Sequence, residues 1–182
     1  MELLIKDPVH NYITFNRKKE QTLISVLGSF AVQRLRRINQ LSTAYIAYPG
    51  AEHSRFAHSI GTMHVARRIL EHLHDIEAVS SGEFEEDFEL ISIAALIHDL
   101  GHGPFSHLFE EFTATPHEQI PLLLLRDHDE PLSMLSQQRA DYPYQISAII
   151  RGDYHRPYIQ TLINSQIDAD RLDYVLRDAI MC

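Results

Sequence analysis

The chain has 182 residues, of which 45% are hydrophobic and 23% are charged, and its formal net charge is −9. This length suits one compact domain with its own core, and the composition excludes a disordered chain. The negative charge argues against a broad nucleic-acid-binding surface, because such binding depends on Lys and Arg side chains that neutralise phosphates. We therefore expect a single domain over residues 1–182 with no strong nucleic-acid footprint.

The sequence lacks the patterns of a membrane protein or an exported protein. No stretch approaches the roughly 18 consecutive apolar residues that a membrane-spanning helix needs. The opening MELLIKDPVH holds no apolar run of signal-peptide length. The single cysteine, Cys182, allows neither an internal disulfide nor a cysteine-based zinc site. We expect a cytoplasmic protein without a membrane partner, in which histidine and carboxylate side chains bind any metal.

Extended structure is expected only at the start of the chain. Residues 3–5 and 12–15 are apolar or β-branched, and Asp7-Pro8 between them favours a turn. These residues predict a short β hairpin.

The rest of the chain has apolar residues at helical spacing. Residues 23–39 predict one amphipathic helix and residues 57–74 a second, with a loop around Pro49-Gly50 between them. The acidic stretch 80–87 is expected to form an exposed, solvated loop. Residues 88–100, FELISIAALIHDL, are apolar nearly all round, which is the pattern of a central helix covered on most sides.

More helices are expected in the second half of the chain, and several of them begin with a proline suited to a first helical turn. Their predicted ranges are 105–112, 116–126, 131–138, 144–151, 157–164 and 168–180. The predicted fold class is all-α, a helical bundle with a small N-terminal β hairpin.

The adjacent pair His98-Asp99 ends the predicted central helix. Burying such a pair in apolar surroundings is costly unless its charge is compensated, and a divalent cation compensates it well. An isolated His-Asp pair is more often an exposed hydrogen-bonded pair. Here His58 opens an earlier helix and Asp170 lies in a later one. Helical bundles build interior metal sites from ligands on separate helices, so the placement of these residues is compatible with a metal site, but their spacing alone does not decide it.

Several stretches resemble the successive motifs of the HD-domain deoxynucleoside triphosphate triphosphohydrolases (dNTPases): HSRFAHSIG, LIHDLGHGPFSH, the pair His117-Glu118 and IDADRLDYVLRD. The opening DPVHNYITF and the segment QRLRRINQLSTAYIAYPGAEHSRF resemble the same branch, so the likeness covers nearly the whole chain. A set of imidazole and carboxylate ligands accepts Mn, Fe, Co, Ni, Zn or Mg without choosing among them. The resemblance implies that the ligands are His58, His98, Asp99 and Asp170.

The resemblance also implies catalytic roles around the metal. His102 and the pair His117-Glu118 match positions along the phosphate path, with His117 as the acid or base and Glu118 orienting it. Asp170 belongs with them as a ligand that takes part in catalysis. From the residues alone, His117 would be a solvated residue at a helix start.

Substrate contacts are implied in the same way. Guanidinium groups can bind phosphate with two hydrogen bonds. Without the resemblance, Arg55 would be interpreted as one partner of a surface ion pair. The positions implied to contact phosphate are Arg55 and Arg171, and those implied to contact the sugar are Tyr174, Asp178, Gln40 and Leu41.

The leading functional hypothesis is metal-dependent hydrolysis of a deoxynucleoside triphosphate to the deoxynucleoside and tripolyphosphate. One alternative is an HD phosphodiesterase or nucleotide phosphatase of other specificity, and another is a non-catalytic nucleotide-binding module. The dNTPase branch continues beyond the motif that ends here, so the sequence is either the N-terminal part of a longer protein or a minimal HD domain. The resemblance further implies a homo-oligomer.

A regulatory nucleotide site of the same branch is matched only in part. Gln33 and Arg36 fit it, whereas Gly28 stands where an acidic residue is expected. Activation by a guanine nucleotide is therefore not expected.

Overall fold

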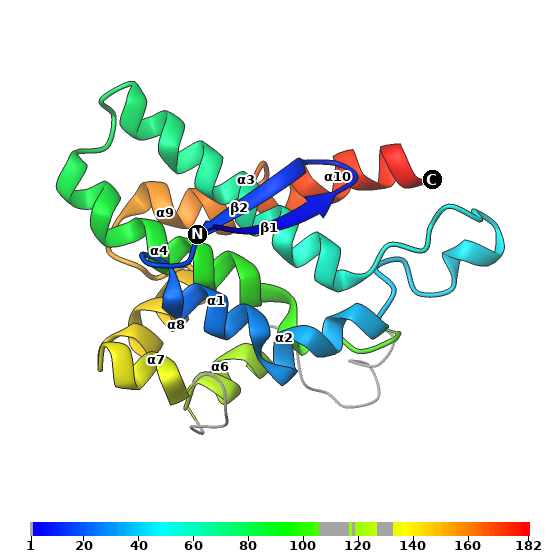
Figure 1. Ribbon diagram of the computed structural model, residues 1–182, viewed down its shortest axis with the longest axis horizontal. Coiled ribbons are helices and arrows are strands. Elements are labelled where there is room, and N and C mark those ends of the chain that lie inside the picture. Colours follow the sequence, from blue (N-terminus) through cyan, green and yellow to red (C-terminus); the bar gives the residue numbers. More distant parts are fainter. Residues whose placement is uncertain (1, 106–116, 118, 127–132) are drawn as a thin grey trace.

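The N-terminal hairpin predicted from the sequence is confirmed. A computed structural model describes residues 2–105, 117, 119–126 and 133–182 (Figure 1). In it β1 (Glu2–Asp7) pairs antiparallel with β2 (Asn11–Asn16). Ile13 and Phe15 alternate with exposed neighbours and are buried, because successive strand residues point to opposite faces.

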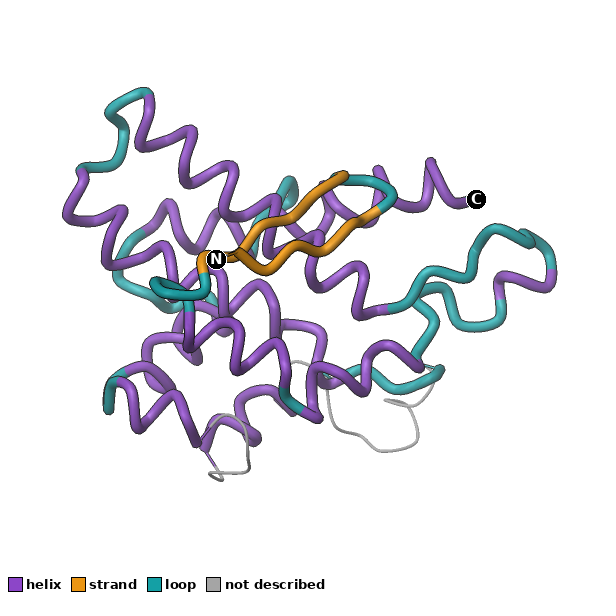
Figure 2. Tube along the Cα trace, viewed as in Figure 1, coloured by secondary structure: helices purple, strands orange, loops and turns teal. Residues whose placement is uncertain are grey.

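Apart from an isolated β-bridge between Asn39 and Ser54, the remaining secondary structure in the described residues is helical (Figure 2), so the predicted all-α class with a small hairpin is confirmed. None of the described helices is both long and apolar enough to cross a membrane. In chain order the elements are α1 (Gln21–Gly28), α2 (Phe30–Arg34), η1 (Leu35–Arg37), η2 (Ala44–Ile46), α3 (Arg55–Asp75), α4 (Ser81–Ile97), η3 (His98–Gly101), α6 (Gln119–Arg126), α7 (Ser133–Gln138), α8 (Tyr142–Arg151), α9 (Pro157–Ile163) and α10 (Ala169–Met181).

The core lies around α4, as the nearly all-round apolar pattern predicts. The last two turns of α4, from Leu90 to Ile97, are buried on every side. Helix α3 packs along α4, and α10 packs along α3 (Figure 1). The first turns of α3 and α10 and the end of α4 are thereby held within one rigid core.

The single helix predicted over 23–39 is wrong. Ser29 takes an extended conformation, with φ −65° and ψ 151°, so α1 ends and α2 begins there. The Ser29 hydroxyl accepts a hydrogen bond from the Val32 amide at 3.2 Å, which caps α2. Apolar residues keep the same helical spacing on both sides of Ser29, so the spacing alone predicts one continuous helix.

The exposed loop predicted over 80–87 is also wrong, because α4 begins at Ser81. Ser80 and Glu83 form a capping box: the Ser80 hydroxyl accepts from the Glu83 amide, and the Glu83 carboxylate accepts from the Ser80 amide. Acidic side chains are favourable in a first helical turn. Asp87 is fully buried, where it accepts hydrogen bonds from the hydroxyls of Tyr154 and Tyr158.

The central helix is shorter at its end than predicted. The α-helix stops at Ile97, and His98-Asp99 lie in the 3-10 turn η3 that follows. Helices are present within most of the later predicted ranges, with ends shifted by a few residues. The helix predicted over 105–112 falls almost entirely outside the described residues.

Candidate metal centre

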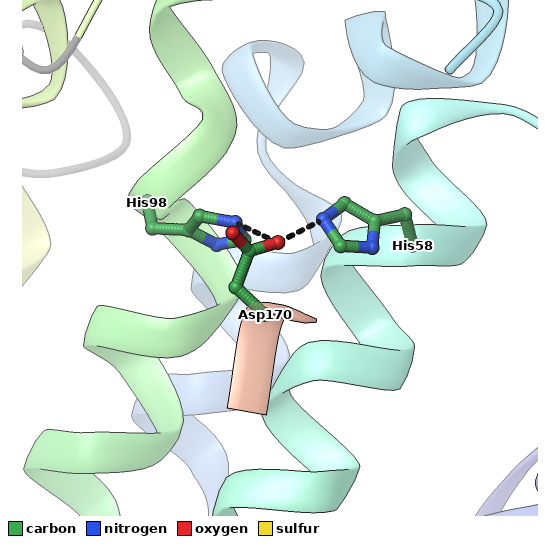
Figure 3. Close-up of side chains that lie close together, drawn as sticks. All are labelled: His58, His98 and Asp170. Carbon is green, nitrogen blue, oxygen red and sulfur yellow. Dashed lines mark ion pairs between the residues drawn. The ribbon is translucent and has the colours of Figure 1, made fainter. Parts of the chain in front are cut away.

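Side chains from three helical elements converge at one point (Figure 3). His58 lies in the first turn of α3, His98 directly follows α4, and Asp170 lies in the first turn of α10. The two helix starts are fixed by caps: Ser54 accepts from the Ala57 amide, and Asp168 accepts from the Arg171 amide.

The potential ligand atoms of His58, His98 and Asp170 lie within 4.8 Å of one another. Asp170 Oδ1 is 2.9 Å from His58 Nε2 and 3.6 Å from His98 Nε2. The structure therefore brings together three of the four ligands predicted from the sequence.

The second ring nitrogen of each histidine is already engaged. His58 Nδ1 lies 2.8 Å from Asp173 Oδ2, and His98 Nδ1 lies 2.7 Å from the carbonyl oxygen of Ala95. In each case the acceptor oxygen favours a proton on Nδ1. A neutral ring then presents the lone pair of Nε2, which is the form that binds metal.

Asp99 lies beside this group and contacts its members. Asp99 Oδ1 is 3.3 Å from His98 Nε2, and Asp99 Oδ2 is 3.7 Å from His58 Nε2. Arg55 donates a hydrogen bond of 2.6 Å to Asp99 Oδ2, and both side chains are buried. Arg55 thus forms a buried ion pair with a predicted ligand.

The residues present fit a divalent cation. The Nε2 atoms of His58 and His98 are buried and form no hydrogen bond of good geometry within the described residues. Buried nitrogens that lack a well-formed hydrogen bond are rare, and a metal ion placed between these nitrogens and the neighbouring carboxylates would satisfy both at once. Two imidazoles with one or two carboxylates form a donor set that suits divalent transition metals.

The titratable groups of the cluster are strongly coupled. Burial opposes the charged form of His58, but contacts with the carboxylates of Asp170 and Asp173 outweigh it and raise the pKa of His58 to about 10. Burial likewise opposes ionisation of Asp170 and Asp99, yet the neighbouring histidines hold the pKa of both carboxyls well below their usual range. In the absence of metal, protons on the histidines balance the carboxylate charges.

A cleft of about 330 Å³ contains the cluster and much of the predicted site. His102 and His117 lie there with stacked rings, their centroids 3.8 Å apart. The cleft is lined by Gln40, Arg55, His58, His98, Asp99, His102, His117, Ile150, Ile163, Asn164, Asp170 and Tyr174.

Three predicted substrate residues are not among those that line the cleft. Leu41 follows Gln40 outside it, and Arg171 is exposed and donates a hydrogen bond to the Gln166 carbonyl at 3.0 Å. Asp178 Oδ1 instead lies 3.0 Å from Nε2 of the buried His53. Glu118 falls outside the described residues.

Several charged residues next to the centre were missed by the sequence analysis. Asp173 and Arg177 are fully buried on α10, and they contact Asp7 and His10 from the N-terminal hairpin. One local signal was available, because Asp173 and Arg177 are four residues apart and face each other on a helix.

The HD-domain model matches residues 55–178, from the first residue of α3 to near the end of α10. The chain belongs to the HD-domain family. Its resemblance to the dNTPase-related branch of HD phosphohydrolases is also confirmed. The matched range carries the whole cluster.

Relatives of this HD domain are longer proteins. The uncharacterized protein YwfO of Bacillus subtilis is 40% identical over 181 residues, which is 98% of this chain and 40% of that protein. The deoxynucleoside triphosphate triphosphohydrolase SAMHD1 homolog of Dictyostelium discoideum is 30% identical over 97% of this chain and 36% of that protein. The chain therefore spans less than half the length of these relatives.

A solved structure has the same fold. A phosphohydrolase from Bacteroides thetaiotaomicron superposes with a TM-score of 0.84 at 30% sequence identity, covering 100% of this chain and 42% of that one.

Proposed function

We propose that this HD domain is a metal-dependent phosphohydrolase that cleaves deoxynucleoside triphosphates to deoxynucleoside and tripolyphosphate. The observation that carries the proposal is the convergence of His58, His98 and Asp170 in a cleft lined by further polar side chains. Relatives named as deoxynucleoside triphosphate triphosphohydrolases support the substrate class.

The proposed ligands are His58, His98, Asp170 and Asp99. A divalent ion held by them would supply Lewis-acid polarisation of a phosphate oxygen and of a water molecule. Hydrogen bonding from Arg55 fixes the Asp99 carboxylate, and the Arg55 guanidinium adds positive charge to the cleft where a phosphate would lie.

The leaving group needs a proton. The oxygen of water bonds to the α-phosphorus as the water releases a proton, the bond from phosphorus to the sugar oxygen breaks, and that sugar oxygen takes up a proton. His117 lines the cleft and is proposed as the donor, with its ring orientation set by stacking on His102.

The sugar side of the cleft is assigned to Gln40 and Tyr174, which both line it. Arg171 is proposed to bind phosphate only after its guanidinium leaves the Gln166 carbonyl. The roles of Leu41, Asp178 and Glu118 stay predictions.

Product-resolved hydrolysis tests this function. Purified protein is incubated with deoxynucleotides, ribonucleotides and phosphodiesters in Mn²⁺, Fe²⁺, Co²⁺, Ni²⁺, Zn²⁺ or Mg²⁺, and the products are separated by ion-exchange chromatography. We expect tripolyphosphate from deoxynucleoside triphosphates, lost in Asp99→Ala. Orthophosphate or a linear nucleotide as the product would favour the phosphodiesterase or phosphatase alternative. Nucleotide-dependent thermal stabilisation without turnover would instead indicate a non-catalytic binding module.

We also propose that the chain forms homo-oligomers. Helix α10 exposes an apolar stripe at three- and four-residue spacing, and contiguous exposed apolar surface typically marks an interaction site. The stripe consists of Leu172, Val175, Leu176 and Ile180, which are 42–56% exposed. Light scattering is expected to show a dimer or larger species that Leu176→Glu converts to monomer. A monomeric wild-type chain at about 100 μM, well above micromolar dissociation constants, would contradict this.

A further inference from the structure

Asp173 is a fully buried carboxylate outside the predicted ligand set. Its Oδ2 lies 2.8 Å from His58 Nδ1, and its Oδ1 lies 2.6 Å from His10 Nε2. Arg177 donates hydrogen bonds to both oxygens, each at 2.9 Å. Within the described residues, each hydrogen bond of the carboxylate is thus with a cationic or potentially cationic group, and such partners favour its ionised form despite burial.

This carboxylate contacts Nδ1 of the His58 ring. An ionised oxygen at Nδ1 holds a proton on that nitrogen, so Nε2 of the neutral ring has the free lone pair. Nε2 is the atom that faces Asp170 and His98 (Figure 3). The same contact increases the basicity of the ring, which strengthens its bond to a metal.

The N-terminal hairpin supports the carboxylate from the other side. Asp7, at the end of β1, binds the Arg177 guanidinium with contacts of 2.9 and 3.3 Å. Asp7 Oδ1 also accepts hydrogen bonds from the amides of Val9 and His10, which shapes the turn that presents His10 to Asp173. The opening DPVH stretch therefore has a structural link to the metal centre.

Close approach of α10 to α3 makes this network fit. A Cβ atom at Gly61 would collide with the carboxylate of Asp173 and the guanidinium of Arg177. The glycine one turn after His58 leaves the space in which these buried groups meet.

We propose that Asp173 is a positioning residue that sets the tautomer and orientation of His58 for metal binding, and that the hairpin turn holds Asp173 through His10 and through the Asp7–Arg177 pair. The inference rests on the proposed metal centre.

The first test is the Zn²⁺ dissociation constant of the 182-residue chain, measured by competition with a chelator. Asp173→Asn keeps the shape of the side chain and removes its charge, and the expected result is a dissociation constant about 10- to 100-fold higher than that of wild type. Asp87→Asn is the matched control, because Asp87 is an equally buried carboxylate bonded to two tyrosines and an arginine. Asp87→Asn is expected to lower thermal stability and leave the dissociation constant unchanged. An Asp173→Asn value within threefold of wild type would overturn the inference while leaving the metal centre intact.

The contribution of the hairpin has its own pair of variants. His10→Gln is expected to weaken Zn²⁺ binding in the same direction, by less than Asp173→Asn does. His64→Gln is the control. The His64 side chain lies on α3 next to His10, with the two ring centroids 5.2 Å apart. Equal Zn²⁺ dissociation constants for His10→Gln and His64→Gln would show that the hairpin does not support the metal centre through His10.

A spectroscopic test needs no variant. In the Zn²⁺-loaded wild-type chain, long-range ¹H–¹⁵N spectra should show the His58 proton on Nδ1 and none on Nε2. A proton on Nε2 would overturn the inference. Absence of Zn²⁺ binding by the wild type would overturn the metal centre and this inference together.

Discussion

Replacing Asp170 with alanine is expected to lower metal affinity by more than about 100-fold. This loss is larger than the usual effect of changing a residue that only hydrogen-bonds to a metal ligand. Asp170 Oδ1 lies between the two imidazole Nε2 atoms, at 2.9 Å from that of His58 and 3.6 Å from that of His98. Without this carboxylate the two imidazoles keep only the Asp99 carboxylate, which is already held by Arg55. Hydrolysis should be lost together with the metal.

Calorimetry and the metal content of the dialysed protein measure this loss. Asp168→Asn is the matched control on the same helix, because asparagine caps a helix about as well as aspartate and Asp168 lies outside the cleft lining. The control should retain metal. The Asp170 side chain is 37% exposed, but its removal deletes an ion pair with the buried His58, so the metal-free variant is expected to fold and to unfold below the wild-type temperature. An Asp170→Ala chain that binds metal within tenfold of wild type would refute the assignment of Asp170 as a ligand.

The hydrophobic pattern predicted the fold where burial alone decides the structure. The stretch 88–97, apolar nearly all round, forms the second half of α4 and is buried from Leu90 to Ile97. The apolar residues on either side of Asp7-Pro8 form the predicted hairpin. The same pattern gave wrong predictions where a side-chain hydrogen bond determines where a helix begins. Ser29 caps a new helix within a continuous apolar stripe. The capping box of Ser80 and Glu83 starts α4 within an acidic stretch.

The candidate ligands were predictable because their motifs and their burial both pointed to them. The same segment allows a pair of Asp173 with Arg177 to be predicted from their spacing, but not the contact of Asp173 with His58. Stepping by four residues from Asp170 selects Tyr174 and Asp178, whereas Asp173 points toward partners more than 100 residues away along the chain. Arg55 shows the same limit, since its contact with Asp99 joins α3 to η3 and has no sequence pattern.

Metal affinity should rise steeply with pH in the wild-type chain. Burial opposes the charged form of His58, but the carboxylates of Asp170 and Asp173 raise its pKa to about 10, and the charge of Asp99 is a cause of the raised pKa of His98. A metal ion needs the neutral rings, so binding at pH 7.5 must release at least one proton. Each released proton changes the dissociation constant about tenfold per pH unit, hence about 100-fold between pH 6.5 and 8.5. Calorimetry in buffers of different ionisation enthalpy counts the protons; a count near zero would contradict the prediction.

Stability of the metal-free chain should depend on pH in the opposite sense. Because the folded-state pKa of His58 is raised, its contribution is fully present below about pH 6.5 and is lost as the pH rises through about 10. Burial lowers the pKa of His64 to about 4, and this histidine destabilises the fold only below about pH 6.5, so the two effects separate. With saturating Zn²⁺ the ion replaces the protons as the partner of the carboxylates. The unfolding temperature should then fall from pH 6.5 to 9 in chelator and rise over the same range in Zn²⁺, and parallel curves would show that the cluster holds no metal.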